Sequence, residues 1–363
     1  MNTEDFGNLH EDKFREGYQQ ERAKRRRPTV LISGYTGCGK SSLIRAVCGN
    51  VVPLDVIGDG RPKTMGFDKY ETEDICVYDS RGLEIGDTEE QFTTVTRDFV
   101  RKRQEERNVD NHIHLVWYAI QGCGARVTDC DINLIRNIFD PDNVIVVITK
   151  KDITRPNQLD ALINRLAEAG VPKRRIIATS DENAGSDGCR ELMEMSYEML
   201  PEAYRDAFVS AQQVDIEKKV KAIKDKKVTA RKIIVAAATA AAAVGAIPIP
   251  GSDAPLLMGE QALMIGALAG VYGFDKGQMK QVALPMLARV GGMMMASSLV
   301  KLIPFAGSVI QAGVAGLITT AMGWFVADQF EKNAIAIVRG EAVSEFAFDP
   351  SAFVQYYEKY KTL

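Results

Sequence analysis

The stretch GYTGCGKS, residues Gly34–Ser41, follows the apolar run Thr29–Ser33 and precedes a helical pattern that reads SLIRAV. It fits the motif GxxxxGK[ST] in the context that the motif requires, with a strand before it and a helix after it. Glycines let backbone N–H groups curve around phosphate oxygens, and the helix N-terminus adds the positive end of its dipole. Lys40 is expected to neutralise charge at the β- and γ-phosphates, and Ser41 to offer its hydroxyl to Mg²⁺. The stretch therefore predicts a phosphate-binding loop in an α/β domain.

Short β-branched runs recur along the first half of the chain, at spacings that leave room for helices. This alternation predicts βαβ units and a mostly parallel sheet with helices on both faces. Phe67–Glu71 is expected to be an antiparallel edge strand, because it is too polar for a strand buried on both faces. Thr128 and Asp131 have the spacing of a helix-capping pair. The expected parallel strands are Thr29–Ser33, Ile75–Asp79, His114–Ile120, Val144–Thr149 and Arg175–Thr179.

Two further motifs follow strands in this half of the chain. The sequence DSRG, residues 79–82, places Asp79 where it can hold Mg²⁺ through water and Gly82 where its amide can contact a γ-phosphate. The sequence TKKD, residues 149–152, ends a later strand. Its Asp152 can accept two hydrogen bonds from the Watson–Crick edge of guanine, which adenine does not offer. In this order the three motifs predict a guanine-nucleotide site.

With these motifs, residues 29–200 resemble the translation-factor-related GTPases, particularly the Era-like and septin-like branch. The resemblance implies an α/β P-loop G domain that binds GTP and GDP with Mg²⁺ and hydrolyses GTP. It implies metal contacts by Ser41, Thr64 and Asp79, and catalytic roles for Lys40, Thr64 and Gly82. Thr64 stands at the switch I position, and Ser180 lies in the last base-contacting loop, Ala178-Thr179-Ser180. The implied nucleotide-binding residues are Gly34, Thr36, Gly37, Cys38, Gly39, Lys40, Ser41, Ser42, Thr149, Lys150, Asp152 and Ser180.

Leu83 departs from the Ras-like pattern, in which the residue after this motif is a glutamine that orients water. A leucine cannot polarise water, so intrinsic hydrolysis is expected to be slow and to need a group from elsewhere. Dimerisation or an activating partner would be one source of that group. Arg81, Glu84 and Arg126 are the nearby candidates in sequence, although each is expected to be a switch or surface residue.

Three positions of the nucleotide motifs bear on the resemblance further. Gly37 stands where the potassium-activated relatives carry asparagine, which argues against potassium stimulation. Thr149 replaces the asparagine that begins the guanine motif, a change expected to loosen support of the phosphate loop without removing the base contact. Cys38 is expected to be an inert small side chain rather than a reactive thiol.

The second half of the chain is nearly uncharged: residues 233–252 and 302–327 contain no Asp, Glu, Lys or Arg. The sequence IPIPGS at 247–252 returns as IPFAGS at 303–308, each time between apolar stretches. Because proline ends a helix and glycine permits a sharp reversal, each copy predicts the turn of an αα-hairpin. Two hairpins and a helix near Ser351–Tyr360 would make an all-α helical-hairpin domain. The sequence IPIPGSDAPLL resembles a helical domain of unknown function attached to bacterial GTPases of this type.

Two interpretations of this half remain open. Basic residues in 218–232 could meet an anionic lipid surface while the hairpins enter the bilayer, or the helices could bury one another in a soluble bundle. Glu260 and Arg289 would be costly in lipid, and Ile233–Gly245 is shorter than the roughly 20 residues that a span requires. We favour a peripheral or conditionally inserting domain.

The expected organisation is a charged N-terminal helix or tail at 1–27, a G domain at 28–202, a basic linker helix or broken linker at 203–232 and a helical domain at 233–363. Lys24–Arg27 is expected to be a solvated helix end. The formal net charge of −3 gives no overall basic excess for nucleic acid. Cysteines without a CxxC pair and a charged N-terminus predict a reduced, cytoplasmic protein, located peripherally at the inner face of a membrane if it binds lipid.

Three functions are compatible with these features. The favoured one is a GTP-binding switch whose helical half docks, inserts or oligomerises. The second is a membrane-acting or scaffolding protein whose assembly is nucleotide-gated, and the third is a P-loop ATPase or nucleotide kinase, in which TKKD would have no task. His112 and His114 alternate into a strand and predict sheet packing rather than metal binding.

Overall fold

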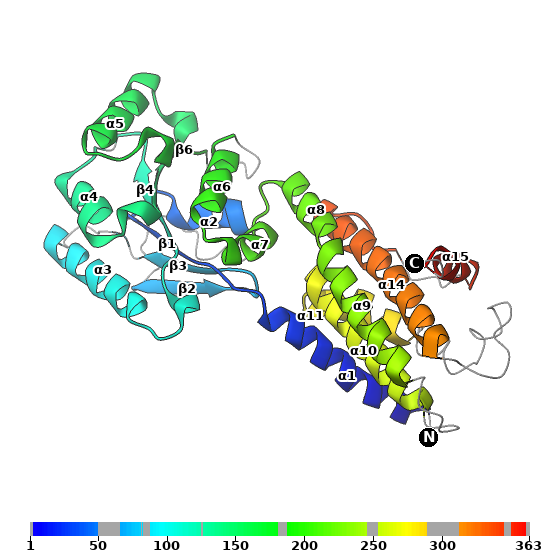
Figure 1. The fold of residues 1–363 in the computed structure, drawn as a ribbon. Helices are drawn as coiled ribbons and strands as arrows, with labels where there is room; N and C mark the ends of the chain where they lie inside the picture. Colours follow the sequence, from blue (N-terminus) through cyan, green and yellow to red (C-terminus); the bar gives the residue numbers. More distant parts are fainter. Residues whose placement is uncertain are drawn as a thin grey trace. The chain divides into compact units, whose positions relative to one another are not determined.

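The computed structural model describes residues 3–49, 66–80, 82, 88–124, 126–180, 187–244, 253–288, 312–344 and 350–360. The chain forms two compact units (Figure 1). One is Arg25–Ile216, and the other combines Met1–Lys24 with Glu217–Leu363. The chain therefore begins in the second unit, leaves it to form the first, and then returns.

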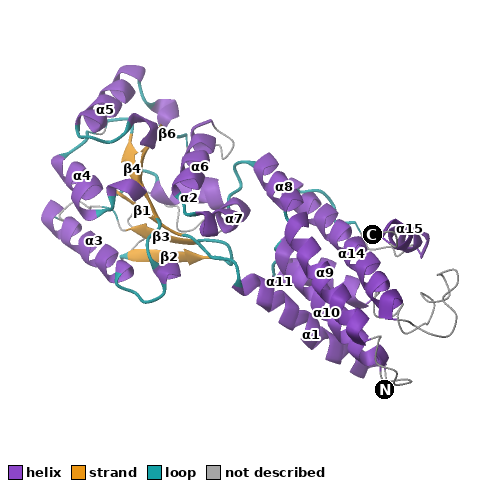
Figure 2. Ribbon diagram, viewed as in Figure 1, coloured by secondary structure: helices purple, strands orange, loops and turns teal. Residues whose placement is uncertain are grey.

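Arg25–Ile216 contains a six-stranded sheet of order β2-β3-β1-β4-β5-β6, drawn in orange in Figure 2. All neighbouring strands are parallel except β2, which pairs antiparallel with β3. The sequence predicted this mostly parallel sheet and its polar antiparallel edge. The strands are β1 (Thr29–Gly34), β2 (Phe67–Glu71), β3 (Cys76–Ser80), β4 (Leu115–Gln121), β5 (Val144–Thr149) and β6 (Ile176–Ala178).

Helices cover both faces of this sheet, as predicted. Alternate side chains of each strand enter different cores: Ile32 belongs to the core shared with α2, α6 and α7, while Leu31 belongs to the core shared with α3, α4 and α5. Thr128 and Asp131 form the expected capping box at the start of α4. The helices are α2 (Lys40–Cys48), α3 (Glu89–Gln104), α4 (Asp129–Asn133), which continues as a π-helical turn at Leu134–Ile138, α5 (Pro156–Glu168), α6 (Asp187–Met199) and α7 (Glu202–Ala211).

The second unit is entirely helical where the structure describes it. Helices α9, α10 and α14 pack on one another around a single core that includes Ile234, Leu268 and Phe330. Among the described helices, none is long and apolar enough to cross a membrane. The repeated turns at 247–252 and 303–308 lie outside the described residues. The helices are α1 (Thr3–Ala23), α8 (Ile216–Asp225), α9 (Lys227–Val244), α10 (Asp253–Tyr272), α11 (Lys276–Gln278) with a π-helical turn at Met279–Ala283, α14 (Ala312–Arg339) and α15 (Pro350–Tyr360).

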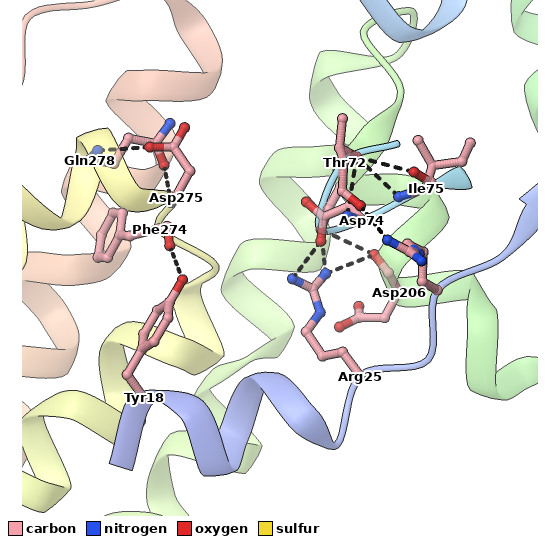
Figure 3. Close-up of polar contacts among 11 residues, drawn as sticks. Tyr18, Arg25, Thr72, Asp74, Ile75, Asp206, Phe274, Asp275 and Gln278 are labelled. Atoms are coloured by element: carbon pink, nitrogen blue, oxygen red, sulfur yellow. Dashed lines mark hydrogen bonds and ion pairs between the residues drawn. The ribbon is translucent and has the colours of Figure 1, made fainter. Parts of the chain in front are cut away.

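The sequence predicted a charged helix or tail at 1–27; it forms helix α1, which also packs along α10. A Cβ atom on Gly266 would lie 1.8 Å from the backbone oxygen of Phe14, and one on Gly17 would lie 2.1 Å from that of Leu263. The two backbones therefore meet at glycines. Figure 3 shows that the hydroxyl of Tyr18 also donates to the backbone oxygen of Phe274, at 2.6 Å.

In the basic run after α1, Lys24 and Arg26 are exposed as expected, whereas Arg25 and Arg27 are not. The guanidinium of Arg25 forms an ion pair with Asp74 at 2.9 Å (Figure 3), with its side chain only 13% exposed. It also donates to Ser210 Oγ at 2.8 Å. Arg27 pairs with Glu71 and donates to the backbone oxygen of Thr72 at 3.0 Å. These arginines anchor the entry into β1 against β2, the turn between β2 and β3, and α7.

Of the two forms expected for the linker at 203–232, the structure shows the broken one. It comprises most of α7, all of α8 and the start of α9, and Ile216 ends the sheet-containing unit. The described fold is thus a mostly parallel α/β unit together with a helical unit.

Candidate functional site

The loop between β1 and α2 depends on glycine conformations. Gly37 and Gly39 have φ values of 77° and 87°, in the left-handed region that glycine adopts at no steric cost, and Gly39 is the N-cap of α2. The main chain therefore curves tightly just before it enters the N-terminus of α2. This is the arrangement that the motif predicts for binding phosphate.

Lys40 lies over this loop with its side chain buried. Its Nζ donates to the backbone oxygens of Gly34, at 3.2 Å, and Tyr35, at 2.9 Å. An ammonium group held by neutral carbonyls can exchange them for phosphate oxygens, which are stronger, charged acceptors. Lys40 thus lies within the phosphate loop, where such an exchange could take place.

Ser41 and Asp79 meet beside the same loop. Ser41 Oγ donates to Asp79 Oδ2 at 2.5 Å, and Asp79 is 1% exposed. The other oxygen, Oδ1, is buried and has no hydrogen-bond partner among the described residues. Burial raises the pKa of this carboxyl, and the Ser41 hydrogen bond opposes the shift. A hydroxyl next to a carboxylate oxygen that lacks a partner suits a hard divalent cation, so these residues fit Mg²⁺.

Gly82 lies against the phosphate loop. A Cβ atom there would come within 2.2 Å of the backbone nitrogen of Thr36, so only glycine permits this approach. The structure thereby brings the DSRG motif to the loop. Thr64, Arg81, Leu83 and Glu84 fall outside the described residues, and Arg126 is exposed.

The TKKD motif contacts the phosphate loop at two points. Thr149 is fully buried, and its Oγ1 donates to the backbone oxygen of Cys38 at 2.6 Å. Lys150 has a left-handed backbone, with φ 57°, and its Nζ donates to the backbone oxygen of Gly37 at 2.9 Å. The expected loss of loop support at Thr149 is therefore wrong in one respect, because its hydroxyl reaches the loop directly.

Asp152 and Ser180 come together from separate loops. Ser180 Oγ donates to Asp152 Oδ1 at 3.1 Å, and the amide of Lys151 donates to the backbone oxygen of Thr179 at 3.0 Å. Asp152 is exposed, so its carboxylate is open to a ligand. The two predicted base-contacting segments are thus adjacent.

Cys38, Ser42 and His114 are the remaining residues that the sequence singled out, and the structure shows how each one is packed. Cys38 is buried and Ser42 is half-buried on the first turn of α2. His114 accepts a hydrogen bond at Nδ1 from the amide of Thr29, at 3.0 Å, and packs on Tyr204. Within the described part of the chain, no group of three or more His, Cys, Asp and Glu side chains could hold a metal ion.

The motifs did not identify Tyr35, whose hydroxyl lies 3.1 Å from Thr128 Oγ1 and 3.3 Å from Glu89 Oε1. Tyr35 occupies a variable position of the phosphate-loop motif. The motif therefore gave no reason to select it, and its partners lie far along the chain.

Strand order, the phosphate loop after β1, the carboxylate at the end of β3 and the guanine motif after β5 together define a P-loop GTPase domain. Comparison with known families agrees in part: residues 84–233, less than half of the chain, match the family described as Septin. That match begins after the phosphate loop and DSRG and contains TKKD.

Among curated proteins, the septin CDC11 of Candida albicans is 26% identical over 157 residues, covering 36% of this chain. The match spans 39% of that relative's length. Similar solved structures include the G domain of the FeoB iron transporter of T. maritima, with a TM-score of 0.31 and 18% identity over 47% of this chain and 98% of that one. Toc33 of Arabidopsis thaliana has a TM-score of 0.36 and 16% identity over 55% of this chain and 91% of its own.

Proposed function

We propose that this protein is a Mg²⁺-dependent GTP-binding switch that slowly hydrolyses GTP to GDP and phosphate. The observation that carries the proposal is the buried pair Ser41 and Asp79, whose Oδ1 lacks a hydrogen-bond partner among the described residues, beside the phosphate loop. A hydroxyl and a carboxylate at this position have the chemistry of a metal–triphosphate site.

The residues of the site have separate tasks in this proposal. Lys40 exchanges its two carbonyl partners for phosphate oxygens, and the loop amides from Gly37 to Ser41 bind the phosphates. Ser41 and Asp79 hold Mg²⁺, with Thr64 as a further proposed ligand; when bound, the ion neutralises phosphate charge. Gly82 contacts the γ-phosphate through its amide. Hydrolysis is slow because Leu83 cannot orient water, so a second copy or a partner completes the reaction.

Asp152 reads the base. Its carboxylate accepts two hydrogen bonds from guanine, while Ser180 fixes the orientation of the carboxylate through Oδ1. An ATPase or nucleotide kinase is disfavoured because this acceptor pair has no counterpart on adenine.

Titration calorimetry with GDP, a GTP analogue and ATP, each with Mg²⁺, tests nucleotide recognition. We expect guanine-selective binding that Lys40→Ala abolishes. Arg45→Ala, on the last turn of the same helix, is the matched control and should leave binding intact. Folded wild-type protein that binds neither guanine nucleotide would overturn the proposal.

The helical unit is proposed to act at the cytoplasmic face of an anionic membrane, controlled by the nucleotide. Helices α8 and α9 present exposed basic residues next to exposed valines: Val228 is 66% exposed and Val235 is 55% exposed. Within α9, helical spacing puts the two valines on one face with Arg231 and Lys232, and Lys221 and Lys224 are exposed on the separate helix α8. Such a face suits adsorption to anionic headgroups with shallow insertion of valine.

Vesicle flotation with and without a non-hydrolysable GTP analogue tests this second proposal. Wild-type protein should float with phosphatidylserine vesicles more than with phosphatidylcholine vesicles, and Val228→Ser with Val235→Ser should float less. Val95→Ser is the matched control, since Val95 is 56% exposed on α3. Nucleotide-dependent self-assembly without flotation would instead support the scaffolding alternative.

A further inference from the structure

Tyr35, in the phosphate loop, makes polar contacts through both its backbone oxygen and its side-chain hydroxyl. Its backbone oxygen accepts from Lys40 Nζ at 2.9 Å. Its hydroxyl reaches Glu89 Oε1 at 3.3 Å, in the first turn of α3, and Thr128 Oγ1 at 3.1 Å, at the N-cap of α4. One residue therefore joins the lysine expected to bind phosphate to the beginnings of two helices.

Thr128 is itself held by the buried carboxylate of Asp131. Asp131 Oδ2 accepts from the Thr128 amide at 2.7 Å and from the Thr128 hydroxyl at 2.9 Å. Asp131 Oδ1 accepts from the hydroxyl of Tyr118 at 2.6 Å. Asp131 therefore keeps bonds at both oxygens even when the Thr128 hydroxyl points elsewhere.

The hydroxyls of Tyr35 and Thr128 carry one proton each, and these two protons can be arranged in two ways. In the first, Thr128 donates to Tyr35 and Tyr35 donates to Glu89. In the second, Tyr35 donates to Thr128 and Thr128 donates to Asp131. Each hydroxyl donates its proton in both, so Glu89 can be bound or released without leaving an unpaired hydroxyl proton. Burial raises the pKa of Tyr35 to about 12, which keeps this hydroxyl a donor at neutral pH.

Bound nucleotide favours the second arrangement for two reasons. Phosphate oxygens draw Lys40 Nζ away from the backbone oxygen of Tyr35 and so remove one restraint on that residue. The phosphate charge also repels the Glu89 carboxylate. Because Glu89 is exposed, water can replace its lost hydrogen bond at little cost.

We propose that Tyr35 is a positioning residue that couples the phosphate loop to α3, holding Glu89 when the loop is empty and releasing it when nucleotide binds. The inference deepens the proposed function, since it needs a nucleotide to displace Lys40. It identifies the contact that changes when the switch binds nucleotide, which is the hydrogen bond between Tyr35 and Glu89 in the first turn of α3.

The Tyr35–Glu89 contact exists only in the empty state, so it opposes binding. We therefore expect Tyr35→Phe to bind the GTP analogue about 2- to 10-fold more tightly, a size typical of one hydrogen bond to a charged group. Glu89→Ala should tighten binding likewise, and the double variant should gain no more than the stronger single one. Glu90→Ala is the matched control, because Glu90 carries the same charge in the same turn.

Hydrogen exchange of the α3 amides provides a second readout. If Tyr35 only stabilised the fold, exchange in α3 would not depend on nucleotide. In wild-type protein these amides should exchange faster once nucleotide binds, whereas in Tyr35→Phe they should exchange fast in both states. Unchanged or weaker binding by Tyr35→Phe, with exchange like that of wild type, would overturn the inference while leaving GTP binding established. Wild-type protein that binds no nucleotide would overturn the proposed function itself, and with it this inference.

Discussion

The hydroxyl of Thr149 donates to the backbone oxygen of Cys38 at 2.6 Å, across 111 residues of chain. The end of β5 thus restrains the loop between β1 and α2. Thr149→Val keeps the shape of the side chain but leaves a buried carbonyl without its donor, which should destabilise the protein by about 1–2 kcal/mol. Nucleotide affinity should fall about tenfold, because the loop is less preorganised. Thr149→Ser retains the hydroxyl and should stay near wild type in calorimetry; equal behaviour of the Val and Ser variants would contradict the role given to this bond.

Asp152→Asn replaces one acceptor of the proposed base contact with a donor. Guanine presents N–H donors there, whereas xanthine has a carbonyl at the position of the guanine amino group. Guanine nucleotides should therefore bind at least about 100-fold more weakly, and xanthine nucleotides should gain affinity. Competition between GDP and XDP measures the exchange. Asp160→Asn, at an exposed position on α5, is a control that should keep guanine preference. If Asp152→Asn also keeps it, the base assignment is wrong.

His114 should make the stability of the sheet-containing unit depend on pH. Burial lowers the pKa of its imidazole, while the unfolded chain takes up a proton near pH 6.5. As pH falls, the unfolded chain therefore takes up this proton before the folded protein does. The contribution of neutral His114 to the free energy of unfolding is fully present above about pH 6.5 and is lost as pH drops toward and through the lower folded pKa. His114→Asn keeps an acceptor for the Thr29 amide and should flatten this decline. Urea titrations followed by Trp117 fluorescence in a Trp324→Phe background, from about pH 7.5 to about pH 5.5, compare the two slopes. Parallel profiles would remove His114 as the cause.

Two glycines of α10 provide a matched test of the α1–α10 contact. Gly266→Ala would put a methyl group 1.8 Å from the backbone oxygen of Phe14, so the helices must separate. We expect a loss of about 2 kcal/mol or more. At Gly259 the nearest atom to a new Cβ is Lys13 Cγ at 4.0 Å, and alanine there should stabilise the helix by up to about 1 kcal/mol. Hydrogen exchange of α1 and α10, with α2 as an internal reference, measures both changes. Similar exchange in the two variants would show that α1 does not need this close approach.

The strands and the phosphate loop were predictable because their signals are local. Val144–Thr149 is an uninterrupted β-branched run and forms β5 with those bounds. The motif at 34–41 specifies both its conformation and its neighbouring elements. Asp79 was predicted from its position after a strand, and its contact with Ser41 follows from the parallel pairing of β1 and β3.

The contacts that sequence missed join distant segments. The sequence predicted a charged helix or tail at the N-terminus without a packing partner, although Phe14, Gly17 and Tyr18 have the helical spacing of one buried face. The partners of Tyr35 were not predictable, since nothing local links it to Glu89 or Thr128. Arg25 similarly depends on Asp74 and Ser210, which only the folded sheet brings near.

Because α1 belongs to the helical unit, the two parts of that unit are synthesised at different times, with the sheet-containing unit between them. When α1 leaves the ribosome, its partner α10 has not yet been made, and Arg25–Ile216 must be translated first. The apolar face of α1 around Phe14 and Tyr18 therefore waits uncovered while the sheet-containing unit folds as an insertion. Removal of the first 24 residues would leave the α1-facing surface of α10 exposed in the finished protein, so the N-terminal residues are integral to the helical half.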